Sequence, residues 1–92
     1  MSNIDWSKLI TKEMKEKQRI IALMGDVTAE QSRRKRIADD AIQSLQDDHD
    51  TGDVDDDGEA MLIAWKRYRS ALAKIQLQPG YPTTVDWPAP PV

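Results

Sequence analysis

Acidic residues gather in one short segment, Asp53-Val54-Asp55-Asp56-Asp57-Gly58, whose spacing matches the opening half of a calcium-binding loop. Such a loop places carboxylates at its first, third and fifth positions and a glycine at its sixth, where the chain turns sharply. The second half does not fit, because the twelfth position is Ala64 and the ninth is Met61. A solvated loop that ends in an acidic helix cap explains the segment better, and we expect neither a metal site nor a cofactor.

A basic cluster, Arg33-Arg34-Lys35-Arg36, could bind the phosphates of a nucleic acid. Four consecutive helical residues point in different directions around the helix axis and do not line one groove. Glu30, Asp39 and Asp40 lie four residues from members of the cluster and can neutralise part of its charge. We therefore expect a solvated, paired helix face and no nucleic-acid partner. A small regulatory nucleic-acid-binding protein using residues 33–36 is the alternative function, and salt-dependent DNA binding would distinguish it.

Other chemistry has little support in the sequence. His49 is the single histidine and the chain has no cysteine, so a transition-metal site lacks a second strong ligand. A thin helical protein offers no pocket for a nucleophile and its base, so the sequence does not predict an enzyme. Residues 1–24 hold five Lys or Arg and three acidic residues without an unbroken apolar run. Neither a signal peptide nor a membrane partner is expected, which favours a protein inside its cell.

The large aliphatic residues are few, since Ile, Leu and Val together number 18 of 92 residues and Phe is absent. Such a composition gives a thin core, which needs help from a partner or from a second copy in a homo-oligomer. Glycine and proline divide the chain into an N-terminal segment (1–25), a middle segment (26–77) and a C-terminal tail (78–92). In the first segment, apolar residues at helical spacing predict an amphipathic helix that ends at a break around Gly25: Trp6, Ile10, Met14, Ile21 and Met24.

The middle segment predicts two more helices. Thr28 and Gln31 have the spacing of a capping box, so one helix should run from there to about residue 46. An acidic loop over 46–58 should follow, with Asp56 and Glu59 capping the next helix. That helix has the most regular apolar period in the chain: Met61, Trp65, Tyr68, Leu72 and Ile75. The fold class is thus all-α, with an antiparallel helical hairpin that places Ala38 or Ile42 near Trp65 and Tyr68.

The tail cannot be helical, because all five prolines of the chain lie after residue 78. We expect it to be extended and packed on the hairpin, since it carries Tyr81, Val85 and Trp87, which a free linker would lack. Trp65, Tyr68 and Arg69 share one side of the last helix, within reach of Trp87-Pro88. These side chains either complete the protein's own core or present an interface, and the two roles are compatible.

Several of these segments resemble the C-terminal region of tailed-phage tail fibre assembly proteins and the related tail assembly chaperones. The resemblance is carried by Ala64-Trp65-Lys66-Arg67-Tyr68-Arg69, by Gln78-Pro79-Gly80-Tyr81-Pro82 and by Val85-Asp86-Trp87-Pro88. Leu45-Gln46-Asp47, Gly52 and Leu72 add to it, and the opening residues 4–15 look like the segment that often precedes this hairpin in the same phage proteins. Residues 16–36 match these proteins only in their helical character.

The resemblance implies a non-enzymatic chaperone that helps a fibre or tail protein fold and assemble in the bacterial host cytoplasm, in some cases remaining on the virion fibre. Fibre shafts are intertwined β-rich trimers whose slow, non-local pairing exposes strand edges, so a dedicated partner would suppress aggregation. The expected partner-binding cluster is aromatic: Trp65, Tyr68, Arg69, Tyr81, Trp87 and Pro88. The expected docking helix uses the apolar stripe of the N-terminal segment, to bind either the fibre protein or another copy of the chain.

Overall fold

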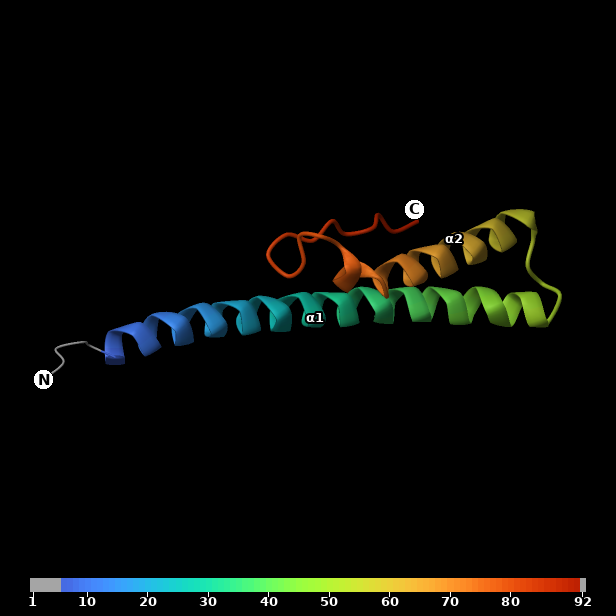
Figure 1. The fold of residues 1–92 in the computed structure, drawn as a ribbon. Coiled ribbons are helices and arrows are strands. Elements are labelled where there is room, and N and C mark those ends of the chain that lie inside the picture. The colour runs from blue at the N-terminus through green and yellow to red at the C-terminus, as the bar shows by residue number, and fades with distance from the viewer. Residues whose placement is uncertain (1–5, 92) are drawn as a thin grey trace, which may run out of the picture.

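The computed structural model describes residues 6–91, with side chains described from residue 11 onwards. Its elements are a long helix α1 (Trp6–Asp50), a shorter helix α2 (Asp56–Leu72) and a 3₁₀ turn η1 (Ile75–Leu77). Figure 1 shows α2 running back along the C-terminal half of α1, with the tail returning over α2. No strand occurs among the described residues, and the prediction of an all-α fold with two antiparallel helices is confirmed.

The predicted break around Gly25 is wrong, because α1 continues through it as one helix of 45 residues. An internal glycine costs a helix about 1 kcal/mol relative to alanine, and the good helix formers up to Met24 and from Ala29 onwards offset that cost. No proline forces an end, and the space around Gly25 is open. Thr28 and Gln31 therefore lie inside the helix and form no capping box. Residues 6–25 are therefore continuous with the rest of α1, residues 1–5 of the predicted segment lie outside the described residues, and the separate functional role of segment 1–25 stays a prediction.

The acidic loop is shorter than expected, covering residues 51–55 instead of 46–58. Side-chain pairs four residues apart extend α1 to Asp50, since the Gln46 Nε2 donates to Asp50 Oδ1 at 3.0 Å. The N-cap of α2 is Asp55, one residue before the expected cap, and its Oδ1 accepts from the Gly58 amide at 2.7 Å. The acidic first turn of α2 matches the prediction and suits the positive end of the helix dipole.

The core lies where α2 crosses α1. Its buried side chains number six among the residues that the structure describes: Ala38, Ile42, Leu62, Tyr68, Leu72 and Ile75. Ala38, Tyr68 and Leu72 pack as one cluster, which confirms the predicted contact between Ala38 and the aromatic face of α2. The small Ala38 side chain is fully buried and lets the two helices approach closely. So small a core leaves the tail as an important source of further burial.

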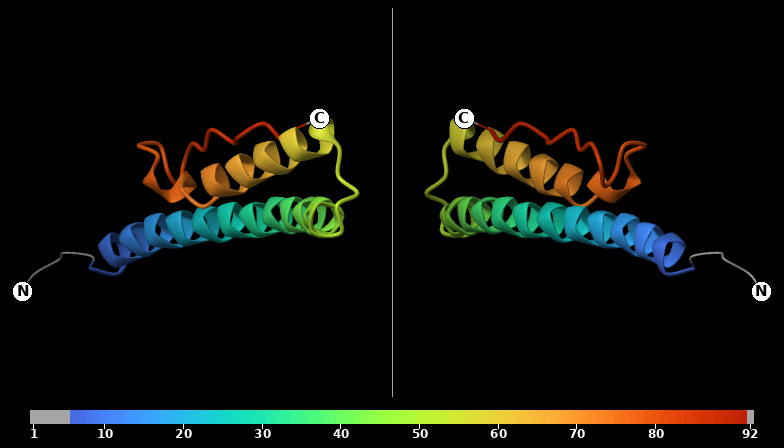
Figure 2. Two further views of the ribbon diagram at one scale, coloured as in Figure 1. Left: turned by 90° about the vertical axis from the view of Figure 1, so that its right-hand side faces the viewer. Right: turned by 90° about the vertical axis from the view of Figure 1, so that its left-hand side faces the viewer.

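The N-terminal part of α1 projects past the hairpin and the tail, as both views in Figure 2 show. We call residues 6–24 of α1 the arm. Met14, Ile21 and Met24 on the arm are 51%, 66% and 42% exposed. No helix within the described range is long and apolar enough to cross a membrane. The arm is therefore a polar helix with an uncovered apolar stripe.

Candidate partner-binding surface

Trp87 of the tail packs on the core cluster. It lies with Trp65 against Ala38, Tyr68 and Leu72, so the tail completes a core that the two helices leave open. Trp65 and Tyr68 meet edge to face, with ring centroids 5.6 Å apart and an interplanar angle of 84°. Edge-to-face pairs add about 0.5–1.5 kcal/mol beyond the area that they bury. Trp65, Tyr68 and Trp87 thus belong to one cluster.

Arg34 of α1 holds the tail from the other side. Its guanidinium carbon lies 4.7 Å from the centroid of the Trp87 ring, and its Nη1 donates to the Pro88 carbonyl oxygen at 3.5 Å. Its Nε donates to Glu30 Oε1 at 2.8 Å, and 24% of the side chain is exposed. A guanidinium stacked on an indole in a partly desolvated site is a favourable cation–π contact. Arg34 therefore serves tail docking and is not free to bind a phosphate.

Glu30 organises the cations around this contact. It accepts hydrogen bonds from Arg33 at 2.7 Å and from Arg34 at 2.8 Å, and these two bonds lower its pKa from 4.5 to about 2. The hydrogen bond to Glu30 also raises the pKa of Arg34. On the next turn, Lys35 pairs with Asp39 at 3.1 Å. Acidic residues thus pair with three members of the basic cluster, and no observation favours the nucleic-acid alternative.

Acid should weaken the fold through Glu30. Because the folded-state pKa is depressed, the contribution of its ionised carboxylate is fully present above pH 4.5 and is lost as the pH falls toward about 2. Glu30→Gln should therefore reduce the loss of thermal stability across this window. Part of the loss should remain, because hydrogen bonds from Arg69, which has the larger effect, and from Lys35 also lower the pKa of Asp39. Melting temperatures of both proteins across the acid range measure the difference. Identical acid dependence would contradict this role of Glu30.

Hydrogen bonds of the Gln78 side chain fix the loop that begins the tail. The Gln78 side chain makes two hydrogen bonds to the backbone of Asp86, its Nε2 donating to the carbonyl oxygen and its Oε1 accepting from the amide, each at 2.8 Å. Inside this clamp the Thr84 amide donates to the Gly80 carbonyl at 2.8 Å. A Cβ at Gly80 would lie 2.7 Å from the Thr84 carbonyl oxygen. The loop from Gln78 to Asp86 is therefore closed on itself, and this closure sets where Trp87 begins.

Gly80→Ala should destabilise the protein by about 1–3 kcal/mol, because the added methyl group meets backbone that cannot move without opening the loop. Gly25→Ala is the matched control, since a Cβ there meets nothing within 4 Å and alanine favours the helix. The control should be neutral or slightly stabilising. Urea denaturation followed by circular dichroism compares the two variants, and equal stabilities would show that the close approach at Gly80 is relaxed in solution.

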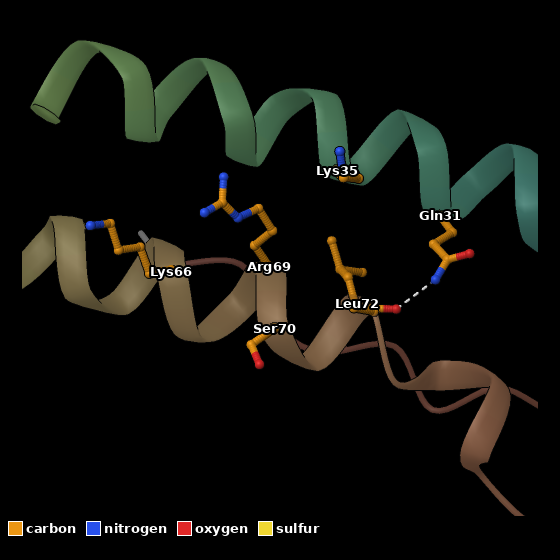
Figure 3. A pocket seen from close by; sticks show the side chains of 7 residues that line it. Gln31, Lys35, Lys66, Arg69, Ser70 and Leu72 are labelled. Carbon is orange, nitrogen blue, oxygen red and sulfur yellow. Dashed lines mark hydrogen bonds between the residues drawn. The ribbon is translucent and has the colours of Figure 1, made fainter. Parts of the chain in front are cut away.

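A shallow pocket of about 330 Å³ opens between α1 and α2 (Figure 3). Arg69 and Lys35 at this pocket both bind Asp39, while Lys66 donates to Gln46 Oε1 at 3.1 Å. At the pocket's other end, the Gln31 Nε2 donates to the Leu72 carbonyl at 2.7 Å, as the dashed line shows. The contacts of Arg69, Lys66 and Gln31 join α1 to α2.

The acidic loop and His49 form no ligand cluster in the structure. His49 lies 3.6 Å from a carboxylate oxygen of Asp50 and 3.6 Å from one of Glu59, between the end of α1 and the start of α2. No group of three or more potential metal ligands occurs within residues 6–91. The loop connects the two helices and caps α2.

The expected partner-binding cluster is brought together only in part. Trp65, Trp87 and the buried Tyr68 share the core cluster, and Tyr81 and Pro88 are half-buried in the tail. Arg69 instead bridges to Asp39 at 3.0 Å. In the expected docking helix, Met14, Ile21 and Met24 are exposed, while the side chains of Trp6 and Ile10 lie outside the described part of the chain.

Sequence reasoning missed three polar residues that position the tail and the helices: Gln31, Arg34 and Gln78. One signal could have found two of them. Gln31 and Arg34 precede the core residue Ala38 by seven and four positions, so both lie on the apolar face of α1 where a polar side chain needs a partner. Gln78 carries no such signal, because it lies in an irregular segment.

The comparison with protein families gives a match over almost the whole chain. A family model described as Caudovirales tail fibre assembly protein, lambda gpK, matches residues 3–92. No curated protein and no solved structure matches the chain. The matched range includes the arm, both helices and the tail with its docked Trp87. The chain therefore belongs to the Caudovirales tail fibre assembly protein family, and its role is in phage tail fibre assembly.

Proposed function

We propose that this protein is a non-enzymatic chaperone that binds the tail fibre protein in the host cytoplasm and assists its folding and assembly. Its binding surface is the outer side of the docked tail together with the adjoining aromatic face of α2. The observation that carries this assignment is the fixed, half-exposed Trp87, which the core cluster holds on one side and Arg34 on another. A pre-positioned aromatic side chain loses little conformational freedom on binding, which favours its use as an anchor.

The surroundings of Trp87 suit such an interface. Trp65, Tyr81 and Pro88 are half-buried, so each has an internal face that packs and an outer face that a partner can cover. Aromatic residues are enriched at the centres of protein interfaces because they combine apolar area with few rotatable bonds. A chaperone for slow-folding β-rich chains needs a surface that competes with premature edge pairing. The docked tail gives the protein such a surface without exposing its core.

Co-expression with the tail fibre protein tests the proposal. Tyr81→Ala removes an aromatic side chain of the proposed surface that lies outside the core cluster, so the variant should remain folded. Ile63→Ala is the matched control, since Ile63 is 51% exposed and lies nine residues from Leu72, on the opposite face of α2. We expect Tyr81→Ala to lower the recovery of fibre protein by pull-down and the yield of assembled fibre, and Ile63→Ala to leave both unchanged.

Two results would overturn the proposal in different ways. If both variants bind fibre like the wild type and a chain without residues 1–24 does not, the arm binds fibre and the surface is misassigned. If the wild-type protein neither binds the fibre protein nor raises the yield of assembled fibre, the chaperone function itself is wrong.

A further inference from the structure

The buried face of α1 follows a seven-residue repeat that extends beyond the hairpin. Within the hairpin this face carries Gln31, which bonds to α2, Arg34, which stacks on Trp87, and the buried Ala38. Two interleaved series contain these positions and continue toward the N-terminus: Met24, Gln31, Ala38 and Leu45, and Ile20, Val27, Arg34 and Ala41. Alternating steps of three and four residues are the pattern of a coiled coil. The surface that α2 covers therefore continues onto the arm, where α2 does not reach.

The arm extends the same two series with a charged pair. Toward the N-terminus, the series of Met24 continues with Lys17 and Ile10. The series of Ile20 continues with Glu13 and Trp6. Neither Glu13 nor Lys17 makes an ion pair within residues 11–91, although Glu16 beside them bonds to Arg19 at 2.8 Å. Two opposite charges thus lie within an apolar stripe and have no ion-pair partner among the described side chains. A partner that covers the stripe has to neutralise both of them.

We propose that the partner is a second copy of this chain, and that two arms pair as an antiparallel coiled coil centred near residue 15. In such a coil each layer joins one position of the first series to one position of the second. With the centre near residue 15, positions whose numbers add up to 30 share a layer. Glu13 of each copy then lies opposite Lys17 of the other, and the two-fold axis relates these two layers. The same register places Ile10 opposite Ile20 and Trp6 opposite Met24.

The charges select this arrangement over a parallel one. A parallel pair would place Glu13 opposite Glu13 and Lys17 opposite Lys17, and like charges facing each other in an interface are strongly unfavourable. The antiparallel pair also places the exposed Met14 and Ile21 beside the seam, where they extend the apolar area. The two hairpins then lie at opposite ends of the dimer, so both proposed fibre-binding surfaces stay accessible.

Charge exchange in the full-length chain tests the pairing. Sedimentation velocity should show that the wild type dimerises with rising concentration, while E13K and K17E each weaken dimerisation at least tenfold because all central charges become alike. An equimolar mixture of E13K and K17E should recover the association, since each central layer then pairs Lys with Glu. If the mixture stays monomeric while its components remain helical by circular dichroism, the proposed layers are wrong.

Engineered cysteines test the orientation, because the natural chain has none. An antiparallel pair centred near residue 15 brings residue 10 beside residue 20, whereas a parallel pair brings residue 20 beside its own copy. We expect I10C mixed with I20C to give a mixed disulfide dimer on mild oxidation, and I20C alone to stay uncrosslinked. Efficient crosslinking of I20C alone would overturn the antiparallel arrangement.

A strictly monomeric wild type at all accessible concentrations would overturn self-association itself. Neither outcome depends on fibre binding, which the pull-down measures separately.

Discussion

Replacing Leu72 by alanine should lower the free energy of unfolding by about 3 kcal/mol, within the usual range for buried leucines. Leu72 is only 1% exposed and contacts both Ala38 of α1 and the neighbouring Tyr68. Neither helix can close the resulting cavity, because Ala38 has no more volume to supply and the tail is fixed by its own contacts. A small domain has a narrow stability margin, so the variant should be largely unfolded at growth temperature. Urea denaturation followed by circular dichroism gives the measurement.

Leu77→Ala is the control for this variant. Leu77 is the same residue type five positions later, and it is 81% exposed. Its replacement should change stability by less than about 0.5 kcal/mol, as surface substitutions generally do. Equal losses for the two variants would mean that the core is not centred where α2 crosses α1.

The parts of the fold that local patterns encode could be predicted from the sequence. Met61, Trp65, Tyr68 and Leu72 repeat at helical spacing after a run of acidic residues, and α2 begins at the expected Asp56. It ends at Leu72, so Ile75, which the same spacing placed in this helix, begins the separate 3₁₀ turn η1. The antiparallel contact with Ala38 followed, because short connections join neighbouring helices. The helical pattern depends on residues within one or two turns of one another, and the contact with Ala38 depends on the short connection between the two helices.

The errors arose where small free energies compete. The sequence predicts a break at Gly25, yet the cost of about 1 kcal/mol is small beside a helix that continues for many turns on both sides. The acidic loop is shorter than its composition predicts for a similar reason, since the side-chain pairs Gln43–Asp47 and Gln46–Asp50 support additional helical turns. A single residue type is a weak signal when its neighbours favour the opposite state.

In the candidate site, too, local contacts could be predicted from the sequence and long-range polar contacts could not. The stripe of α2 predicted Trp65 and Tyr68 as neighbours, because they lie three residues apart on one helix face. The role of Arg34 could not be predicted, since its partner Pro88 lies 54 residues away and the same cation has a local partner in Glu30. The clamp of Gln78 on Asp86 depends on the path of an irregular loop, which has no period. Long-range polar contacts therefore required the structure.

Replacing Trp87 in the tail should also lower the free energy of unfolding substantially. Trp87→Ala should cost about 3 kcal/mol, because it removes the side chain that covers Ala38, Tyr68 and Leu72 and also leaves the Arg34 guanidinium without its ring. Trp87→Phe is the matched variant, since phenylalanine keeps an apolar ring in the same place with less area. It should lose less than half as much stability. Thermal and urea denaturation of the three proteins give the comparison.

The same variants separate two roles of Trp87 when the fibre assay is performed at a temperature where each protein remains folded. A destabilised Trp87→Ala protein that still assists assembly in the cold would show that the indole serves the core alone, and the fibre-binding surface would then have to centre on Trp65 and Tyr81. A variant that melts like the wild type and fails to assist would show the reverse, because a side chain that supports no core can matter only through its partner. Loss of both stability and assistance in the cold, with Trp87→Phe intermediate in each, is the expected result. The ring lies between the core and solvent, so its inner face should stabilise the hairpin while its outer face remains available to the fibre protein.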